Sequence, residues 1–191
     1  MDLISRVKGI VLAPREEWLM IEREGLSLGD LYLRYALILI VASSLARALG
    51  LLFFGFPMRH LGVGFSPASI GGWAFFEILV ETGILFAAAF VVQYLAPRFG
   101  GRSDFLAANK LVVFSSTPGW LGGLLGIFPP LGALGGLLGL YGLYLFYLGA
   151  PVILNIPEEK KGSFLAVCLL VFLGLFLLMG LFLSPFHPGY S

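Results

Sequence analysis

Two acidic residues, Glu77 and Glu81, interrupt a long apolar stretch of the sequence, GGWAFFEILVETGILFAAAFVVQYLAP. Because they are four residues apart, a helix places both carboxylates on one face. A carboxylate in apolar surroundings holds a proton, binds a cation or forms an ion pair. Glu77 and Glu81 are therefore the candidate proton, cation or metal ligands of this chain.

Arg47 is the candidate partner of these acids. It lies inside another apolar stretch, residues 33–54, where an unpaired charge is expensive. At ~1.5 Å of rise per helical residue, Arg47 and Glu77 lie at similar depths, about 10 Å from the same membrane boundary, so we expect them to pair. Glu81 is one turn deeper and has no obvious basic partner, and the hydroxyl of Tyr144 is a candidate to bond it.

Two interpretations of these polar residues stay open. The first is a structural ion pair with a neutral, hydrogen-bonded Glu81, and the second is a site that handles protons or a cation. Neither a nucleophile nor a second carboxylate pair accompanies them, so the sequence predicts no enzyme and no cofactor. The single cysteine excludes a disulfide framework, and a net charge of +1 without a basic, aromatic-rich block argues against nucleic acid.

Apolar composition determines the fold class. The chain is 59% hydrophobic and 12% charged, whereas soluble domains are about 25% charged. Five apolar runs are long enough to cross a bilayer: 33–54, 70–96, 107–128, 131–154 and 163–183. We therefore expect an all-α, polytopic membrane protein, with an amphipathic segment at 1–32, a five-helix domain at 33–183 and an external tail at 184–191.

The distribution of Lys and Arg predicts the orientation. Ten lie in the N-terminal segment and in the connections on the same side, and one lies on the other side. Basic loops stay in the cytoplasm. We expect the N-terminus inside and the C-terminus outside, in the cytoplasmic membrane of a prokaryote.

The first 32 residues contain two short amphipathic patterns separated by Pro14. Helices of this kind commonly lie in the membrane interface with Trp at the headgroup level, so we expect Trp18 there. A partner-binding surface is the alternative. Arg98 and Arg102, in a basic inner connection, are further candidates for partner contacts. The expected partners are the lipid bilayer and a protein partner or a second copy of the chain.

Glycines mark residues 109–157 as two helices folded together about Pro129-Pro130. In lipid, small residues four apart let helix backbones approach closely. This spacing occurs at Gly119/Gly123, Gly122/Gly126, Gly132/Gly136 and Gly135/Gly139. We expect these glycines to hold the hairpin together, and a leucine at Gly123 or Gly136 to loosen it.

Ser115, Ser116, Thr117 and Pro118 interrupt the first arm of this hairpin. Proline removes a backbone hydrogen bond and kinks a helix, and hydroxyl groups can bond the freed carbonyl. These residues predict either a simple kink or a discontinuous helix of the kind that forms substrate sites in transporters.

Three segments of the chain resemble the bacterial and archaeal branch of the Yip1 family. They are RVKGIVLAPREEWLMIERE at 6–24, APRFGGRSD at 96–104 leading through Lys110 to Thr117-Pro118, and TPGWLGGLLGIFPPLG with LYGLYLFYLGAPVILNIPEEK after it. The resemblance implies five membrane helices and a cytoplasmic N-terminus.

Eukaryotic relatives in this family act in vesicle trafficking and bind small GTPases, and they carry an Asp-Leu-Tyr-Gly-Pro motif. Here Asp30-Leu31-Tyr32 is followed by Leu33-Arg34, and the long acidic N-terminal region is absent. This departure argues against GTPase binding. The leading hypothesis is a non-enzymatic membrane protein that binds lipid or protein partners, and the alternative is a small proton or cation transporter that uses Glu77 and Glu81.

Overall fold

A computed structural model describes residues 2–54 and 67–183, and within these ranges the protein is all-helical. The α-helices are α1 (Leu3–Leu12), α2 (Pro14–Arg23), α3 (Leu28–Leu31), α4 (Leu37–Phe54), α6 (Pro67–Leu95), α7 (Phe105–Leu124), α8 (Gly132–Leu154) and α9 (Lys161–Leu183). A π-helical turn (Tyr32–Ala36) joins α3 to α4. The expected tail at 184–191 lies outside the described residues.

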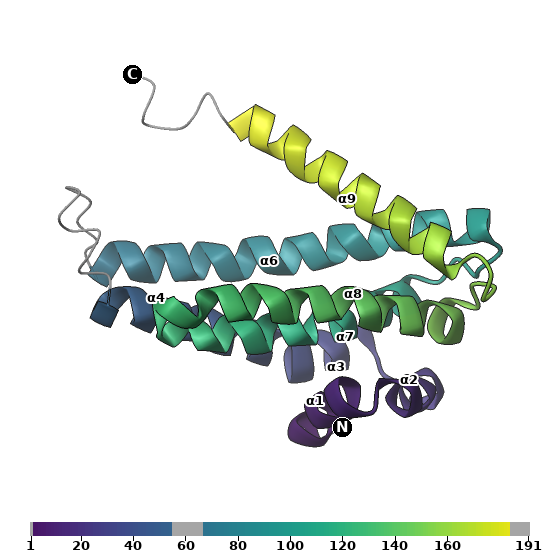
Figure 1. Cartoon of the computed structure of the whole chain (residues 1–191), viewed down its shortest axis with the longest axis horizontal. Helices are drawn as coiled ribbons and strands as arrows, with labels where there is room; N and C mark the ends of the chain where they lie inside the picture. The colour runs from purple at the N-terminus through teal and green to yellow at the C-terminus, as the bar shows by residue number, and fades with distance from the viewer. Residues whose placement is uncertain (1, 55–66, 184–191) are drawn as a thin grey trace.

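Long helices form the body of the molecule. Figure 1 shows α4, α6, α7 and α8 running side by side, while α9 starts beside α6 and α8 and diverges from them. Three stretches among the described residues are long and apolar enough to cross a membrane: Leu28–Phe54, Ile70–Phe99 and Leu134–Leu154. Helix α7 is less apolar because Asn109, Lys110 and the 115–118 segment lower its mean hydropathy.

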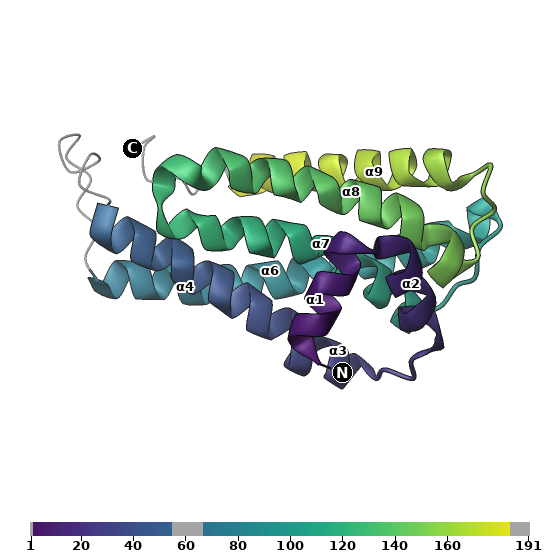
Figure 2. The same ribbon diagram turned by 60° about the horizontal axis from the view of Figure 1, so that its bottom comes forward.

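The positions of the two N-terminal helices contradict the prediction made for Trp18. Figure 2 shows α1 and α2 lying across the bundle, and they contact α7 and α8. The Trp18 side chain is 0% exposed, and its indole N–H donates to the carbonyl oxygen of Leu145 at 3.1 Å. Trp18 fits because Gly149 leaves room, since a Cβ there would lie 2.6 Å from Trp18 Cε2. The prediction that Trp18 lies at the headgroup level or on a partner-binding surface is therefore wrong.

Polar contacts fasten these two helices to the bundle. Lys110 Nζ on α7 donates to the carbonyl oxygens of Ile21 at 3.0 Å and Glu24 at 2.7 Å. The Tyr141 hydroxyl on α8 donates to the carbonyl oxygen of Val11 at 2.9 Å. Buried polar groups need such partners, so α1 and α2 form a fixed part of the fold, which we call the N-terminal cap (residues 3–23).

Glycines bring α7 and α8 together at fewer points than the spacing predicts. A Cβ at Gly122 would lie 2.5 Å from the carbonyl oxygen of Gly135, and one at Gly142 would lie 2.5 Å from that of Ser115. In contrast, a Cβ at Gly136 would meet no atom within 4 Å. The expectation that Gly136 holds the hairpin is therefore wrong, and Gly123 faces α4 instead.

Helix α7 is continuous through Pro118, so of the two alternatives for residues 115–118 the discontinuous helix is wrong. Nearby hydroxyls bond within the bundle: Ser116 Oγ donates to the carbonyl oxygen of Val112 at 2.9 Å, and the Thr117 hydroxyl lies 2.7 Å from that of Tyr35. These bonds satisfy the two hydroxyl groups inside the bundle. The helix ends instead at two 3₁₀ turns, Leu125–Ile127 and Pro129–Leu131.

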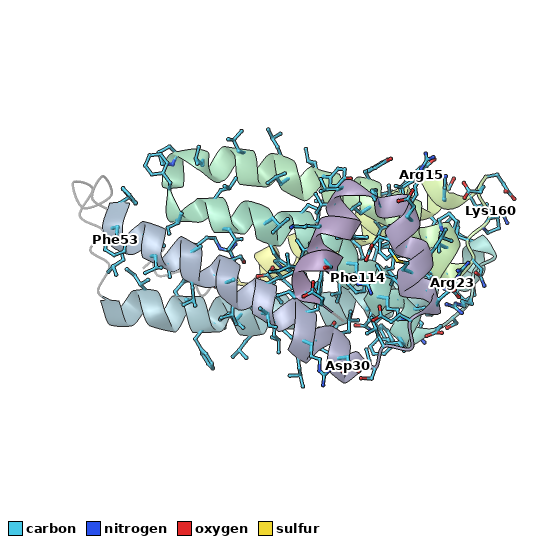
Figure 3. All side chains as sticks on the ribbon, turned by 90° about the horizontal axis from the view of Figure 1, so that it is seen from below. Arg15, Arg23, Asp30, Phe53, Phe114 and Lys160 are labelled. Carbon is cyan, nitrogen blue, oxygen red and sulfur yellow. The ribbon has the colours of Figure 1, made fainter. Side chains whose placement is uncertain are left out.

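Charged side chains concentrate at one end of the molecule. Figure 3 shows nitrogen- and oxygen-bearing side chains around Arg15, Arg23, Asp30 and Lys160, whereas carbon dominates among the side chains drawn near Phe53. We call the first region the basic end. It contains the 96–104 and 155–160 connections.

Candidate functional site: a polar cluster beside an apolar cavity

Two long helices bring together the charged residues that the sequence singles out. Arg47 Nη2 on α4 lies 2.9 Å from Glu77 Oε1 and 3.7 Å from Glu81 Oε2, both on α6. The expected Arg47–Glu77 pair is therefore present. The expectation that Glu81 has no basic partner is wrong, because the guanidinium reaches both acids. The four-residue spacing of the acids makes this possible.

Glu81 has a second partner that the sequence analysis missed. The indole N–H of Trp120, on α7, donates to Glu81 Oε1 at 2.6 Å. Tyr144, the expected partner, is 45% exposed, and the neighbouring Tyr141 hydroxyl bonds the carbonyl oxygen of Val11 instead. A tryptophan N–H is a donor only, so it suits a carboxylate.

Small residues make room for the Arg47 side chain. A Cβ at Gly126 would lie 2.6 Å from Arg47 Cγ, and one at Gly123 would collide with the guanidinium. Ser44, also on α4, donates its hydroxyl to Glu77. Ser44 was identifiable from sequence alone, since it lies three residues before Arg47 and therefore on the same helical face.

One guanidinium serves two carboxylates in this cluster, so its formal charge is −1 if both acids are ionised. Their side chains are about a quarter exposed, at 27% for Arg47, 23% for Glu77 and 29% for Glu81. Within the described part of the chain, no group of three or more His, Cys, Asp or Glu gathers to hold a metal ion. The arrangement is that of an ion-paired network, with Arg47 in the place that a cation would take between Glu77 and Glu81.

An apolar cavity of about 1020 Å³ adjoins the cluster. Helices α6, α7, α8 and α9 all line it, and Glu81 and Trp120 form part of its wall. The other lining residues are Ile84, Leu85, Ala87, Ala88, Val112, Ser115, Ser116, Gly119, Gly139, Gly142, Leu143, Phe146, Leu165, Cys168, Leu169, Phe172 and Leu173. The volume is at the upper end of the range for small-molecule sites.

The cavity wall has few polar groups. Besides Glu81 and Trp120, they are Ser115 and Ser116. Ser116 is satisfied within its own helix, whereas Ser115 Oγ is buried and has no hydrogen-bond partner among the described residues. Mostly apolar walls with few polar groups are typical of ligand sites.

The family model for the Yip1 domain matches residues 8–181. The chain belongs to the Yip1 family. This confirms the resemblance noted from sequence, and together with the long apolar helices it identifies a membrane protein. No curated protein and no solved structure matches the chain.

In this Yip1-family chain, the residues that remain of the Asp-Leu-Tyr motif have internal partners. Asp30 forms a capping box with Ser27 at the start of α3, and Leu31 is fully buried. The Tyr32 hydroxyl donates to Asn109 Oδ1 on α7 at 2.7 Å. The segment therefore anchors the first long helix.

The remaining candidates for partner contacts lie at the basic end. Arg98 is exposed and bonds the Tyr94 hydroxyl at 2.6 Å, with its guanidinium over the Tyr94 ring. Arg102 donates to the carbonyl oxygen of Ile153 at 3.0 Å and so helps to close the bundle. Both residues are exposed, so both stay candidates for partner contacts.

Proposed function

We propose that this Yip1-family protein is a non-enzymatic, five-pass protein of the prokaryotic cytoplasmic membrane that binds lipid within its helix bundle. Lipid binding allows it to organise the surrounding membrane or to present a surface to protein partners, including a second copy of itself. The observation that carries the proposal is the 1020 Å³ cavity between α6, α7, α8 and α9. Its walls are almost entirely apolar, which matches acyl chains better than ions or polar solutes.

Five crossings are supported by the helix lengths and by the surroundings of α7. This helix lies among α4, α6 and α8 and buries most of its residues, so neighbouring helices rather than lipid surround its polar side chains. The basic end then faces the cytoplasm, where positively charged loops are retained. The N-terminal cap lies on the same side, and the domain limits are 1–32, 33–183 and 184–191.

A pair of glycine variants on α8 tests lipid binding. Gly139 lines the cavity and Gly136 does not, and a Cβ at either position would meet no atom within 4 Å. Both leucine variants should therefore fold. We expect lipid analysis of the purified full-length protein to find bound lipid in the wild type and in Gly136→Leu, and a loss of most of it in Gly139→Leu. Equal lipid content in all three proteins, or none in the wild type, contradicts the proposal.

Proton or cation handling is the second candidate, favoured by one observation: Glu81 belongs both to the charged cluster and to the cavity wall. It ranks second because the Arg47 guanidinium lies between the two acids. If Glu81 carries protons or cations, Glu81→Gln in proteoliposomes abolishes a pH- or cation-dependent flux that the wild type shows. No flux from the wild type across a broad range of ions excludes this function.

A further inference from the structure

We propose that the cavity takes acyl chains of a membrane phospholipid from the leaflet away from the basic end, while the head group of this lipid stays at the membrane surface. The chains enter sideways, between α9 and its neighbours α6 and α8. This inference rests on the proposed lipid-binding function and adds which part of the lipid the protein holds and from which side the lipid comes.

The polar groups of the cavity wall are not available to a phospholipid head group. The indole N–H of Trp120 donates to Glu81 at 2.6 Å, and Ser116 donates to a carbonyl oxygen of its own helix at 2.9 Å. The hydroxyl oxygen of Ser115 is buried and does not open into the cavity. A charged or zwitterionic head group would lose its water here without gaining partners, which is expensive. The cavity therefore suits hydrocarbon chains, and the head group stays outside it.

The cavity lies at the depth of lipid chains. On α6 its wall runs from Glu81 to Ala88, and the helix ends at Leu95, beside the basic end. At ~1.5 Å of rise per residue, this part of the wall is roughly 10–20 Å from that end of α6. A hydrocarbon core is ~30 Å thick, so the cavity lies around its middle, where the chains of both leaflets end. Depth alone therefore does not decide which leaflet supplies the chains.

Aromatic side chains close the cavity toward the basic end. Phe164, near the start of α9, is 0% exposed, and its ring centroid lies 5.5 Å from that of Phe99 and 5.8 Å from that of Phe146. Phe146 is also part of the cavity wall. Rings at these distances are in packing contact and hold α9 against the bundle. A chain from the leaflet at the basic end would have to displace them.

Away from the basic end, α9 leaves the bundle and the cavity opens to the membrane. Figure 1 shows α9 diverging from α6 and α8 toward its C-terminal end. Leu173 on α9 and Ile84 on α6 line the cavity, and yet they are 54% and 50% exposed. These side chains belong both to the cavity wall and to the apolar outer surface that faces lipid in a membrane. The cavity is therefore continuous with the interface between the protein and the bilayer.

Photo-crosslinking from one leaflet at a time tests the direction of entry. The probe is a phosphatidylcholine with a diazirine in the middle of one acyl chain. Cyclodextrin delivers it briefly to the exposed leaflet of spheroplasts and of inverted membrane vesicles, both containing the full-length protein. Labelling of Lys160, which is exposed at the basic end, by a membrane-impermeant amine reagent shows which side the basic end faces in each preparation. Adducts at Leu170, which is 67% exposed on α9, show that the probe has been delivered.

We expect the cavity to be labelled from one leaflet only. Leu143 on α8 and Leu169 on α9 line the cavity. Their adducts, counted relative to those at Leu170, should be at least ~10-fold more abundant when the probe enters the leaflet away from the basic end, since displacing packed rings raises the barrier on the other side. Mass spectrometry of the purified protein measures these ratios.

A pair of tryptophan variants on α9 provides the matched control. Leu173 lines the cavity where it opens, whereas Leu170 is exposed and is not part of the cavity wall. Leu173→Trp narrows the opening, so we expect it to lose most of the adduct at Leu143. Leu170→Trp adds the same bulk on the lipid-facing side and leaves the amount of this adduct unchanged. Equal amounts in the two variants contradict entry past Leu173.

The outcomes separate this inference from the proposed function. If cavity adducts come equally from both leaflets, mainly from the leaflet at the basic end, or from neither while the purified protein still contains lipid, this inference is wrong and lipid binding stands. If cavity adducts come from neither leaflet and the purified wild type also contains no lipid, both fail. Adducts that come from the leaflet away from the basic end and depend on Leu173 support both.

Discussion

The two sides of α7 are built differently. On the side that faces the N-terminal cap, Phe114 is fully buried, with Trp18 at a ring-centroid distance of 6.2 Å and Tyr35 at 4.7 Å. On the side that lines the cavity, Ser115 forms part of the wall, and a Cβ at Gly119 would meet no atom within 4 Å. Adjacent residues of one helix therefore belong to a close-packed core and to a cavity.

This difference separates two uses of small residues in a membrane bundle. Gly122 and Gly149 let a neighbouring backbone or a tryptophan come close, which is the familiar role of glycine between membrane helices. A Cβ added at Gly119 or Gly139 would meet no atom within 4 Å. These two glycines therefore do not pack against a neighbouring helix and leave space in the cavity instead. Glycine content alone does not distinguish the two roles.

The largest loss of stability is expected when a buried side chain is removed from the close-packed side of α7, which faces the N-terminal cap. Trp18→Ala removes a fully buried indole and its hydrogen bond to Leu145, which costs ~3–5 kcal/mol of unfolding free energy by the usual cost of such truncations. We expect the thermal midpoint in micelles to fall by about 10 °C. Trp73→Ala is the control, since Trp73 is 44% exposed and should shift the midpoint little. Equal shifts mean that the cap is not part of the folded core.

The second largest effect distinguishes a glycine at a helix contact, Gly122, from a glycine that borders the cavity, Gly119. A leucine at Gly122 collides with the backbone of Gly135, and such overpacking costs ~2–3 kcal/mol. A leucine at Gly119 meets no atom within 4 Å at its Cβ, so thermal stability should stay near that of the wild type. Thermal unfolding of both variants measures the contrast, and similar losses of stability contradict the assignment of these glycines.

The polar cluster lies between the two regions and should respond moderately. Arg47→Leu leaves Glu77 and Glu81 facing each other without their cation, at a cost of ~2 kcal/mol once partial exposure is allowed for. Adding Glu77→Leu removes one of the stranded charges, so the double variant should be more stable than Arg47→Leu alone. Denaturation of the single and double variants checks this order, and a less stable double variant means that Arg47 acts by packing.

The smallest effect concerns the start of the N-terminal cap. Hydrogen bonds from the side chain and backbone of Ser5 lower the pKa of Asp2, which caps α1. Because the folded-state pKa is depressed, this contribution is present above the unfolded-state pKa and is lost as pH falls through the folded-state value. Amide hydrogen exchange should show lower protection at Ser5 in strong acid than at neutral pH, with no such change in Asp2→Ala. Unchanged protection across this range contradicts the cap.

The sequence predicted the helices and one ion pair for reasons that apply generally. Apolar runs must be helical in lipid, and a constant rise per residue places Arg47 and Glu77 at one depth. The burial of Trp18 was not predictable, because the same amphipathic pattern fits a lipid surface and a protein groove equally well. Trp120 was missed as a partner of Glu81 since the two residues are 39 apart in the chain, and no local pattern connects them.

The spacing of the glycines predicted that α7 and α8 approach each other closely, but not which neighbour each glycine faces. It indicated that α7 and α8 carry small residues, and Gly122 with Gly135 fits that expectation. It did not indicate that Gly126 makes room for Arg47 or that Gly136 faces open space. Those facts depend on the rotation of each helix, which three-dimensional packing decides.

The most direct test of lipid binding is a crystal structure of the full-length protein grown from a lipidic mesophase. We predict elongated, chain-like electron density in the cavity lined by α6, α7, α8 and α9, beside Gly139. A cavity that is closed because α9 packs onto α8 would contradict the proposed function.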